Sequence, residues 1–250
     1  MRIADGIEML EIPCNIMGRI ANIYPVLIWD DKEMLLVDTG FPGQLEKFQE
    51  AVKKVGLPFE RISKILLTHQ DIDHVGSLAS IVKELDGKVE VIAHEIEKQY
   101  ITGEKTPIKL AQLEKNKDSL PDDRKGFYEI LKGGFANAKA NVDRTVVDCD
   151  VLPYCGGIKA IYTPGHTPGH ICLYHRNSKT LIAGDEMNIE DGHLTGPNKM
   201  HTYDMGEAVK SLQKFARYDI QNIVSYHSGL YNDNANKAIC ELIESSRAHE

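Results

Sequence analysis

The sequence predicts an α+β protein made of two stacked layers, each built on β-sheet, with helices packed on an outer face. Short apolar strands alternate with amphipathic helices along most of the chain. An amino-terminal hairpin precedes strand–helix–strand segments, which indicates a mixed sheet with antiparallel and parallel strands. The second half echoes the first, because a hairpin again ends at a turn containing Gly and Asp and is followed by a helix.

The first half is predicted to form a hairpin and then to alternate between helix and strand. A tight polar turn at residues 30–32 joins the two hairpin strands. Apolar residues at helical spacing end at Gly56, which is a typical stop signal. The expected strands cover residues 6–12, 22–29, 34–37, 62–67 and 89–93, and the expected helices cover 44–55 and 75–85.

Residues 95–144 differ from their surroundings, because they are rich in Lys, Glu, Asp and Gln and lack strand signals. We interpret them as a mainly helical insertion within a single domain that spans residues 1–250. We expect the insertion to cover the functional site. Its aromatic side chains are expected to fasten it to the core, with substrate contact as the alternative.

The second half returns to a strand pattern. Gly and Pro on both sides of the segment 163–170 predict a tight loop between two strands. Asp204 and Glu207 form a capping box that begins a helix. The expected strands cover residues 145–147, 158–162, 171–174, 180–183 and 220–224, and a closing helix covers 232–246.

Composition limits the classes of function. The chain has 250 residues, 42% hydrophobic and 26% charged, which is enough for one sizeable core. A net charge of −8 gives no basic field for nucleic acid, so we expect a small-molecule substrate. Five scattered cysteines without CxxC spacing are typical of reduced residues in a cytoplasmic protein. No stretch resembles a signal peptide or the roughly 20 apolar residues of a membrane span. The oligomeric state stays open.

The segment 68–74 carries the densest chemistry in the chain. His69, Asp71, Asp73 and His74 follow an apolar strand and precede a helix, so they lie in a loop held by a rigid scaffold. Alternate residues in such a loop can point the same way. Four ligands from so short a segment would crowd one tetrahedral ion, so the spacing favours two adjacent metal ions.

Four further segments complete an ordered pattern. Asp38 follows a strand, Gly-His-Thr-Pro-Gly-His occupies residues 165–170, Gly184 and Asp185 follow another strand, and His227 follows the last one. Together with the segment 68–74, this pattern resembles the metallo-β-lactamase superfamily along nearly the whole chain. The resemblance implies an αββα sandwich, in which two mixed sheets are flanked by helices. It also implies a two-metal site at the edge where strand ends gather.

The resemblance also implies roles for individual residues. One metal would be bound by His69, Asp71 and His166, the other by Asp73, His74 and His227, and Asp185 would bridge both. Asp38 and His170 would orient these ligands. For Asp38, the residues alone leave a turn or helix cap as an equal alternative.

One position departs from the family pattern, which has His where this chain has Asp71. A carboxylate there makes the first metal position harder and richer in oxygen. This favours manganese or iron relative to a site with three histidines. We expect two divalent metal ions, with zinc as the first choice and manganese or iron as alternatives.

The expected function is a metal-dependent hydrolase in which a metal-bound hydroxide attacks the carbonyl of a small ester, lactone or thioester. Asp73 is the expected catalytic residue, because it can orient the nucleophile and accept its proton. A phosphodiesterase is one alternative, and the acidic chain argues against a long nucleic-acid substrate. A non-hydrolytic di-metal oxidoreductase or a binding protein is the other. Intact ligand positions argue against lost activity.

Overall fold

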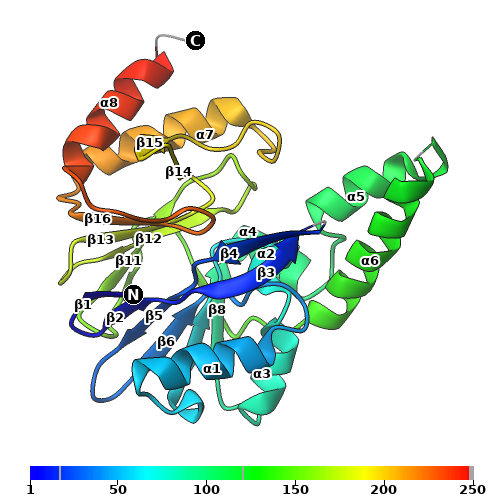
Figure 1. The fold of residues 1–250 in the computed structure, drawn as a ribbon, viewed down its shortest axis with the longest axis horizontal. Coiled ribbons are helices and arrows are strands. Elements are labelled where there is room, and N and C mark those ends of the chain that lie inside the picture. Colours follow the sequence, from blue (N-terminus) through cyan, green and yellow to red (C-terminus); the bar gives the residue numbers. More distant parts are fainter. Residues whose placement is uncertain (17, 120, 248–250) are drawn as a thin grey trace.

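The protein is an αββα sandwich in which two large sheets lie face to face and helices cover both outer faces (Figure 1). The structure is a computed structural model, and it describes residues 1–16, 18–119 and 121–247. The fold predicted from the sequence is confirmed. No helix in these ranges combines the length and apolar character that crossing a bilayer requires.

The first sheet is mixed, as predicted. Its strands β5 and β6 form the expected antiparallel hairpin, whereas β6, β7, β8 and β9 are parallel. The carboxyl ends of β6 and β7 therefore meet at one edge, which places Asp38 beside the segment 68–74. In spatial order the strands are β1 (Arg2–Ala4), β2 (Ile7–Met9), β5 (Val26–Trp29), β6 (Met34–Val37), β7 (Lys64–Leu66), β8 (Glu90–His94) and β9 (Arg144–Val146).

The second sheet is also mixed. Its strands β13 and β16 are parallel, so Asp185 and His227 follow strand ends at the same edge. In spatial order the strands are β10 (Val151–Leu152), β11 (Ile158–Tyr162), β12 (Ile171–His175), β13 (Thr180–Gly184), β16 (Asn222–Ser225) and β17 (Gly229–Tyr231).

Alternation along the central strands builds three core layers. In β6, Met34 and Leu36 pack toward the helices, whereas Leu35 and Val37 pack between the sheets. A third layer joins the second sheet to α7 and α8 through side chains such as Phe215. The helices are α1 (Leu45–Val55), α2 (Ile72–Val75), α3 (Leu78–Glu84), α4 (Glu95–Ile101), α5 (Ile108–Lys115), α6 (Asp122–Ala138), α7 (Met205–Leu212) and α8 (Ala235–Arg247), with 3-10 turns η1 (Phe59–Arg61), η2 (Lys117–Ser119) and η3 (Gln213–Arg217).

The prediction of one strand over residues 22–29 is wrong. β4 (Arg19–Ile23) pairs with β3 (Ile12–Ile16) in a separate hairpin, and β5 begins after Pro25. Pro25 has no N–H to donate to a sheet. Tyr24 instead donates its N–H to the carbonyl of Tyr226 at 2.9 Å, which bends the chain between the two sheets. The expected strand over residues 6–12 is likewise divided between β2 and β3.

The expected helix over residues 75–85 is also interrupted. The N–H of Gly76 bonds to the carbonyl of Gly40, and that of Ser77 bonds to the carbonyl of Thr39. These bonds to the loop after β6 replace the helical ones, so α2 and α3 are separate.

A hairpin after Asp185 was not predicted from the sequence. It is made of β14 (Asn188–Glu190) and β15 (His193–Thr195).

The segment after β8 is helical as far as Ala138, with α4, α5 and α6 joined by short loops. α5 and α6 project from the body of the sandwich (Figure 1). The bounds of an insertion and its role as a cover stay predictions.

Gly165 allows the loop 163–170 to rest on α7. Its φ is +144°, and a Cβ there would lie 2.3 Å from the backbone nitrogen of Ala208.

We expect Gly165→Ala to lower the free energy of unfolding by more than about 1 kcal/mol. Urea denaturation measures this. Gly126→Ala is the matched control, because nothing surrounds Gly126 on the exposed face of α6. Equal unfolding midpoints for both variants would contradict this packing.

Candidate metal centre

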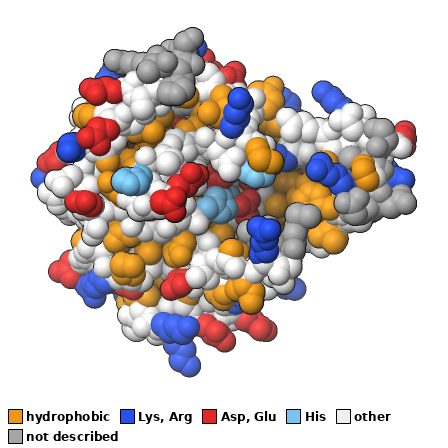
Figure 2. Space-filling model, turned by 45° about the horizontal axis from the view of Figure 1, so that its top comes forward, with side chains coloured by type: hydrophobic (Ala, Val, Ile, Leu, Met, Phe, Trp, Pro, Cys, Tyr) orange, Lys and Arg blue, Asp and Glu red, His pale blue; other side chains and the backbone are white. Residues whose placement is uncertain are grey.

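Seven side chains from loops far apart in the sequence meet at the sandwich edge. They form two groups, and within each group the candidate ligand atoms lie within 4.8 Å of one another. Figure 2 shows histidine and acidic side chains together near the middle of one face, with hydrophobic side chains around them. The first group is His69, Asp71, His166 and Asp185, and the second is Asp73, His74 and His227.

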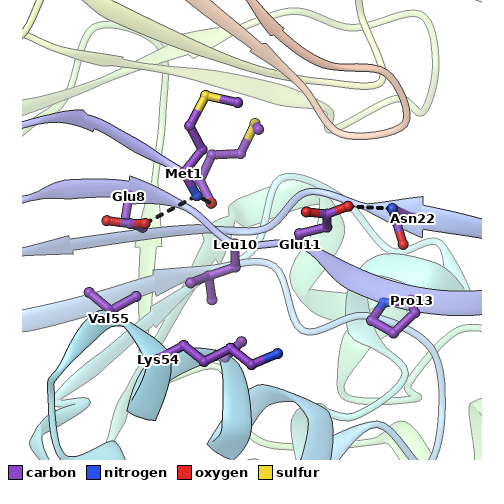
Figure 3. Close-up of a pocket in the computed structure, with 10 residues that line it drawn as sticks. Met1, Glu8, Leu10, Glu11, Pro13, Asn22, Lys54 and Val55 are labelled. Atoms are coloured by element: carbon purple, nitrogen blue, oxygen red, sulfur yellow. Dashed lines mark hydrogen bonds and ion pairs between the residues drawn. The ribbon is translucent and has the colours of Figure 1, made fainter.

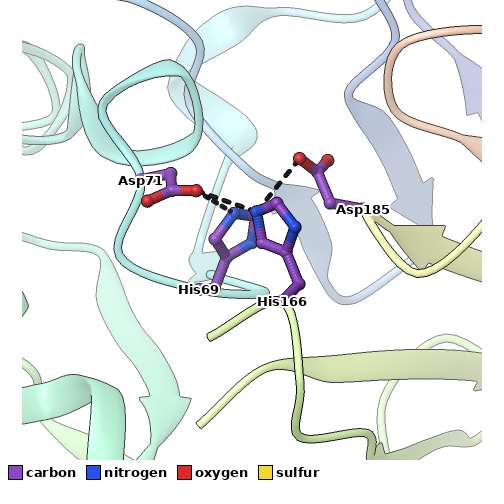
Figure 4. A group of neighbouring side chains, drawn as sticks. All are labelled: His69, Asp71, His166 and Asp185. Atoms are coloured by element: carbon purple, nitrogen blue, oxygen red, sulfur yellow. Dashed lines mark hydrogen bonds and ion pairs between the residues drawn. The ribbon is translucent and has the colours of Figure 1, made fainter. Parts of the chain in front are cut away.

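The first group centres on one carboxylate oxygen (Figure 4). Asp71 Oδ2 lies 3.1 Å from His69 Nε2 and 2.9 Å from His166 Nε2. His166 Nε2 is also 3.3 Å from Asp185 Oδ2. Burial raises the pKa of Asp71, but Lys109 and the histidines outweigh it and hold that pKa well below its usual value. Asp71 is therefore an ionised ligand candidate at neutral pH.

Asp185 belongs to the first group and also faces the second. Its Oδ2 faces His166 of the first group. Its Oδ1 lies 3.2 Å from His74 Nε2 and 3.3 Å from His227 Nε2, in the second group. His227 Nε2 is also 3.3 Å from Asp73 Oδ2. One carboxylate thus presents an oxygen to each group.

The residues fit a pair of divalent cations. His74 Nε2 and Asp185 Oδ1 are buried and lie 3.2 Å apart, but neither makes a hydrogen bond, whereas buried polar atoms are normally paired. Burial lowers the pKa of His74, yet the charges of Asp185, Asp38 and Asp73 outweigh it and raise that pKa to about 10. Such a surplus of negative charge attracts cations. Imidazole and carboxylate donors without a thiolate suit zinc, manganese or iron.

Asp38 fixes how both histidines of the segment 68–74 face the site. Its carboxylate accepts hydrogen bonds from the backbone N–H and the hydroxyl of Thr68, both at 2.8 Å, and lies 2.9 Å from His74 Nδ1. Thr68 Oγ1 is in turn 3.0 Å from His69 Nδ1. Because the Thr68 hydroxyl donates to Asp38, both rings direct their Nδ1 protons toward Asp38 and Thr68. Both Nε2 atoms are then free to bind a metal.

His170 contacts the backbone of Asp185 rather than its carboxylate. The N–H of Asp185 donates to His170 Nε2 at 3.2 Å, so the ring proton resides on Nδ1, 2.9 Å from Thr163 Oγ1. Burial, with the neighbouring histidines, holds the pKa of His170 well below its usual value. A neutral ring therefore fixes the turn that carries Asp185.

Sequence reasoning missed three residues at this site. The ammonium of Lys109, on α5, lies 2.5 Å from Asp71 Oδ2. The hydroxyl of Tyr226 donates to the carbonyl of Asp73 at 2.6 Å, and its ring centroid is 3.8 Å from that of His74. The third, Glu97, is fully buried on α4. Tyr226 could have been found as the neighbour of His227, but nothing in the sequence marks the other two.

A separate pocket of about 410 Å³ opens between α1 and strands β2 and β3 (Figure 3). Its lining includes Glu8, which pairs with the amino terminus at 3.1 Å, and Glu11, which accepts a hydrogen bond from Asn22 at 2.6 Å. The lining contains no histidine. The candidate chemistry is therefore at the strand ends and not in this pocket.

Comparison with known proteins decides the family. The model of the metallo-β-lactamase superfamily matches residues 20–227. The chain belongs to this superfamily. The resemblance expected from the sequence is thus confirmed, and these matches support a metal-binding hydrolase.

Curated relatives and solved structures agree with this membership. Probable metallo-hydrolase YflN of Bacillus subtilis is 28% identical over 246 residues, which covers 91% of this chain and 88% of the relative. Hydroxyacylglutathione hydrolase GloC of Haemophilus influenzae is 26% identical over 163 residues, 64% of each chain. The crystal structure of the metallo-β-lactamase family protein TTHA1429 from Thermus thermophilus superimposes with a TM-score of 0.74 at 23% identity, covering 99% of this chain and 81% of that one.

The contacts of Asp38 generate a prediction. Asp38→Asn places an amide N–H₂ among three donors, so His74 Nδ1 and the Thr68 hydroxyl, which faces His69 Nδ1, compete for the one oxygen that remains. We expect metal binding to weaken by about 10–100-fold. Competition with a chromogenic chelator measures this affinity. Asp86→Asn is the matched control, because Asp86 shares the positive φ of Asp38 but lies in an exposed turn. Unchanged affinity in Asp38→Asn would show that Asp38 does not orient the ligands.

Proposed function

We propose that the protein is a dinuclear metal-dependent hydrolase that cleaves a small ester, lactone or thioester. The observation that carries this proposal is the position of Asp185, whose two oxygens face different ligand groups. A carboxylate in this position is suited to bridge two cations about 3.5–4 Å apart. The name of the relative GloC, a hydroxyacylglutathione hydrolase, supports an acyl substrate of this kind.

In this proposal each side chain has a stated role, and Asp73 has two, as a metal ligand and as a proton acceptor. Asp185 would bridge the two ions, and zinc is the first choice for both, with manganese or iron as alternatives. Asp38 and His170 orient the ligands. One ion would be bound by His69, Asp71 and His166, and the other by Asp73, His74 and His227.

Two bound divalent cations would lower the pKa of water and polarise the carbonyl oxygen of the substrate. The residues of the chain supply the orientation. Burial raises the pKa of Asp73, but His74 and His227 outweigh it and lower that pKa to about 2. Asp73 is thus ionised at neutral pH. It would bind the second ion through one oxygen, orient the attacking water and accept its proton. The hydroxyl of Tyr226 holds its backbone.

The pattern of exposure indicates where substrate approaches. The side chains of His69 and His74 are fully buried, whereas that of His227 is 31% exposed and that of Lys109 is 35% exposed. We propose that substrate enters between His227 and α5. The helical segment 95–144 then acts as a cover within a single domain, because Lys109 reaches the first ligand group from it. A net charge of −8 supports a small-molecule substrate and no nucleic acid.

Activity tests this function directly. We expect protein loaded separately with zinc, manganese or iron to hydrolyse a lactone or a thioester in a screen that also contains a phosphodiester and a β-lactam. His74→Ala removes a ligand of the second ion, and we expect turnover to fall at least about 100-fold. His193→Ala, an exposed histidine on β15, is the matched control. Turnover of the phosphodiester alone would overturn the choice of substrate, and turnover independent of metal would overturn the mechanism.

The carboxylate at position 71 predicts a metal preference. Replacing it with imidazole softens the first position, so Asp71→His should shift bound metal from manganese or iron toward zinc. The variant is made together with Lys109→Met, because the ammonium would otherwise lose its partner. Metal content is measured after equal exposure to the three metals. Lys109→Met alone is the control. An unchanged ratio of metals would mean that Asp71 does not set the preference.

A further inference from the structure

Glu97 is a buried carboxylate that no motif identifies. It lies on α4 with no solvent exposure. Its Oε1 accepts hydrogen bonds from the hydroxyl of Thr167 at 2.8 Å and the N–H of Gly169 at 2.7 Å, and its Oε2 accepts one from Gln70 Nε2 at 2.9 Å. Three donors from two separate loops therefore meet at one side chain.

These donors are neighbours of the candidate ligands of the first ion. Gln70 lies between His69 and Asp71, and Thr167 directly follows His166. We infer that Glu97 is a positioning residue that holds the loop of His166 against the loop of His69 and Asp71 and so sets the affinity of the first metal position. The inference rests on the ligand assignment in the proposed function.

The direction of the hydrogen bond between Gln70 and Glu97 is fixed. Gln70 Oε1 accepts the N–H of Ile108 at 2.8 Å, so the amide N–H₂ of Gln70 must point to Glu97. The residue at position 97 must then be an acceptor on both of its oxygens. Ionised Glu satisfies this requirement, whereas Gln has one oxygen and one N–H₂.

The space around Glu97 is equally restricted. A Cβ on Gly169 would lie 2.6 Å from Glu97 Oε1 and 2.7 Å from its Cγ. The second glycine of the motif at 165–170 thus permits the carboxylate to reach the loop backbone. Burial raises the pKa of Glu97 to about 7, and the three hydrogen bonds oppose that rise. The donors therefore favour the ionised form that the contact needs.

The second metal position has different support. Asp38 lies 2.9 Å from His74 Nδ1, and the hydroxyl of Tyr226 binds the carbonyl of Asp73. None of the three hydrogen bonds of Glu97 described above reaches these residues. Loss of Glu97 should therefore weaken one metal position and leave the other, whereas general destabilisation of the fold would weaken both.

A charge exchange provides the sharpest test. In Glu97→Gln, the new N–H₂ faces the N–H₂ of Gln70. In the double variant Gln70→Glu with Glu97→Gln, the carboxylate now at position 70 can accept from the N–H of Ile108 and from the new amide. The amide oxygen at position 97 still accepts from Thr167 and Gly169. Every hydrogen bond of the original contact is restored, and the one between positions 70 and 97 has the opposite polarity.

The stepwise binding of zinc and cobalt to the protein is measured by chelator competition, and the visible spectrum of bound cobalt reports ligand geometry. The binding step that Asp71→Ala weakens is the step that belongs to the first metal position. We expect Glu97→Gln to weaken that step by about 10–100-fold and to leave the other unchanged. The double variant should recover most of the loss and the cobalt spectrum. Glu95→Gln, an exposed carboxylate on the same helix, is the matched control.

The outcomes separate the two proposals. If the unmodified protein binds two metals and Glu97→Gln binds both equally well, the positioning role is wrong. Equal weakening of both steps without recovery in the double variant also overturns it, because that result indicates only a damaged fold. If the unmodified protein binds no divalent metal, the proposed function fails, and the inference fails with it.

Discussion

Burial of ionised carboxylates at the sandwich edge is the constraint on which the rest of this structure depends. An unpaired charge in such a place costs more free energy than a small domain can offset. Here Asp71 faces two imidazoles and the ammonium of Lys109, while Asp185 lies among three imidazoles. The cluster is tolerated because cationic and polar side chains lie beside the carboxylates, although Asp185 Oδ1 has no hydrogen-bond partner. The same arrangement makes it a receptor for cations.

The parallel strand pairs explain why these charges can meet. β6 with β7 and β13 with β16 all end at one edge, so four loops open onto a shared space. Face-to-face packing of the sheets brings the loops of one close to those of the other. The bond from Tyr24 to the carbonyl of Tyr226 links the sheets beside the site. The fold thus acts as a rigid support for side chains that would otherwise repel one another.

The helices after β8 are part of the site and not only its surroundings. Glu97 on α4 and Lys109 on α5 contact the loops of the first ligand group, and Gln70 joins these contacts through the N–H of Ile108. Movement of these helices would therefore disturb the first ligand group before the second. The segment 95–144, which differs in composition from the rest of the chain, thus contacts Asp71, the candidate ligand that departs from the family pattern.

The sequence alone determined the strand β6, the helix α1 with its stop at Gly56, the family and the order of the candidate ligands. These features depend on periodicity and on residue types close together in the chain, which a sequence displays directly. Only the tertiary structure decided the break at Pro25, the interruption between α2 and α3, and the contacts of Glu97 and Lys109. Gln70 and Glu97 are 27 positions apart, and Glu97 and Thr167 are 70 apart. Contacts at such separations arise from the packing of whole layers, because no local pattern specifies which distant partner a buried charge will meet.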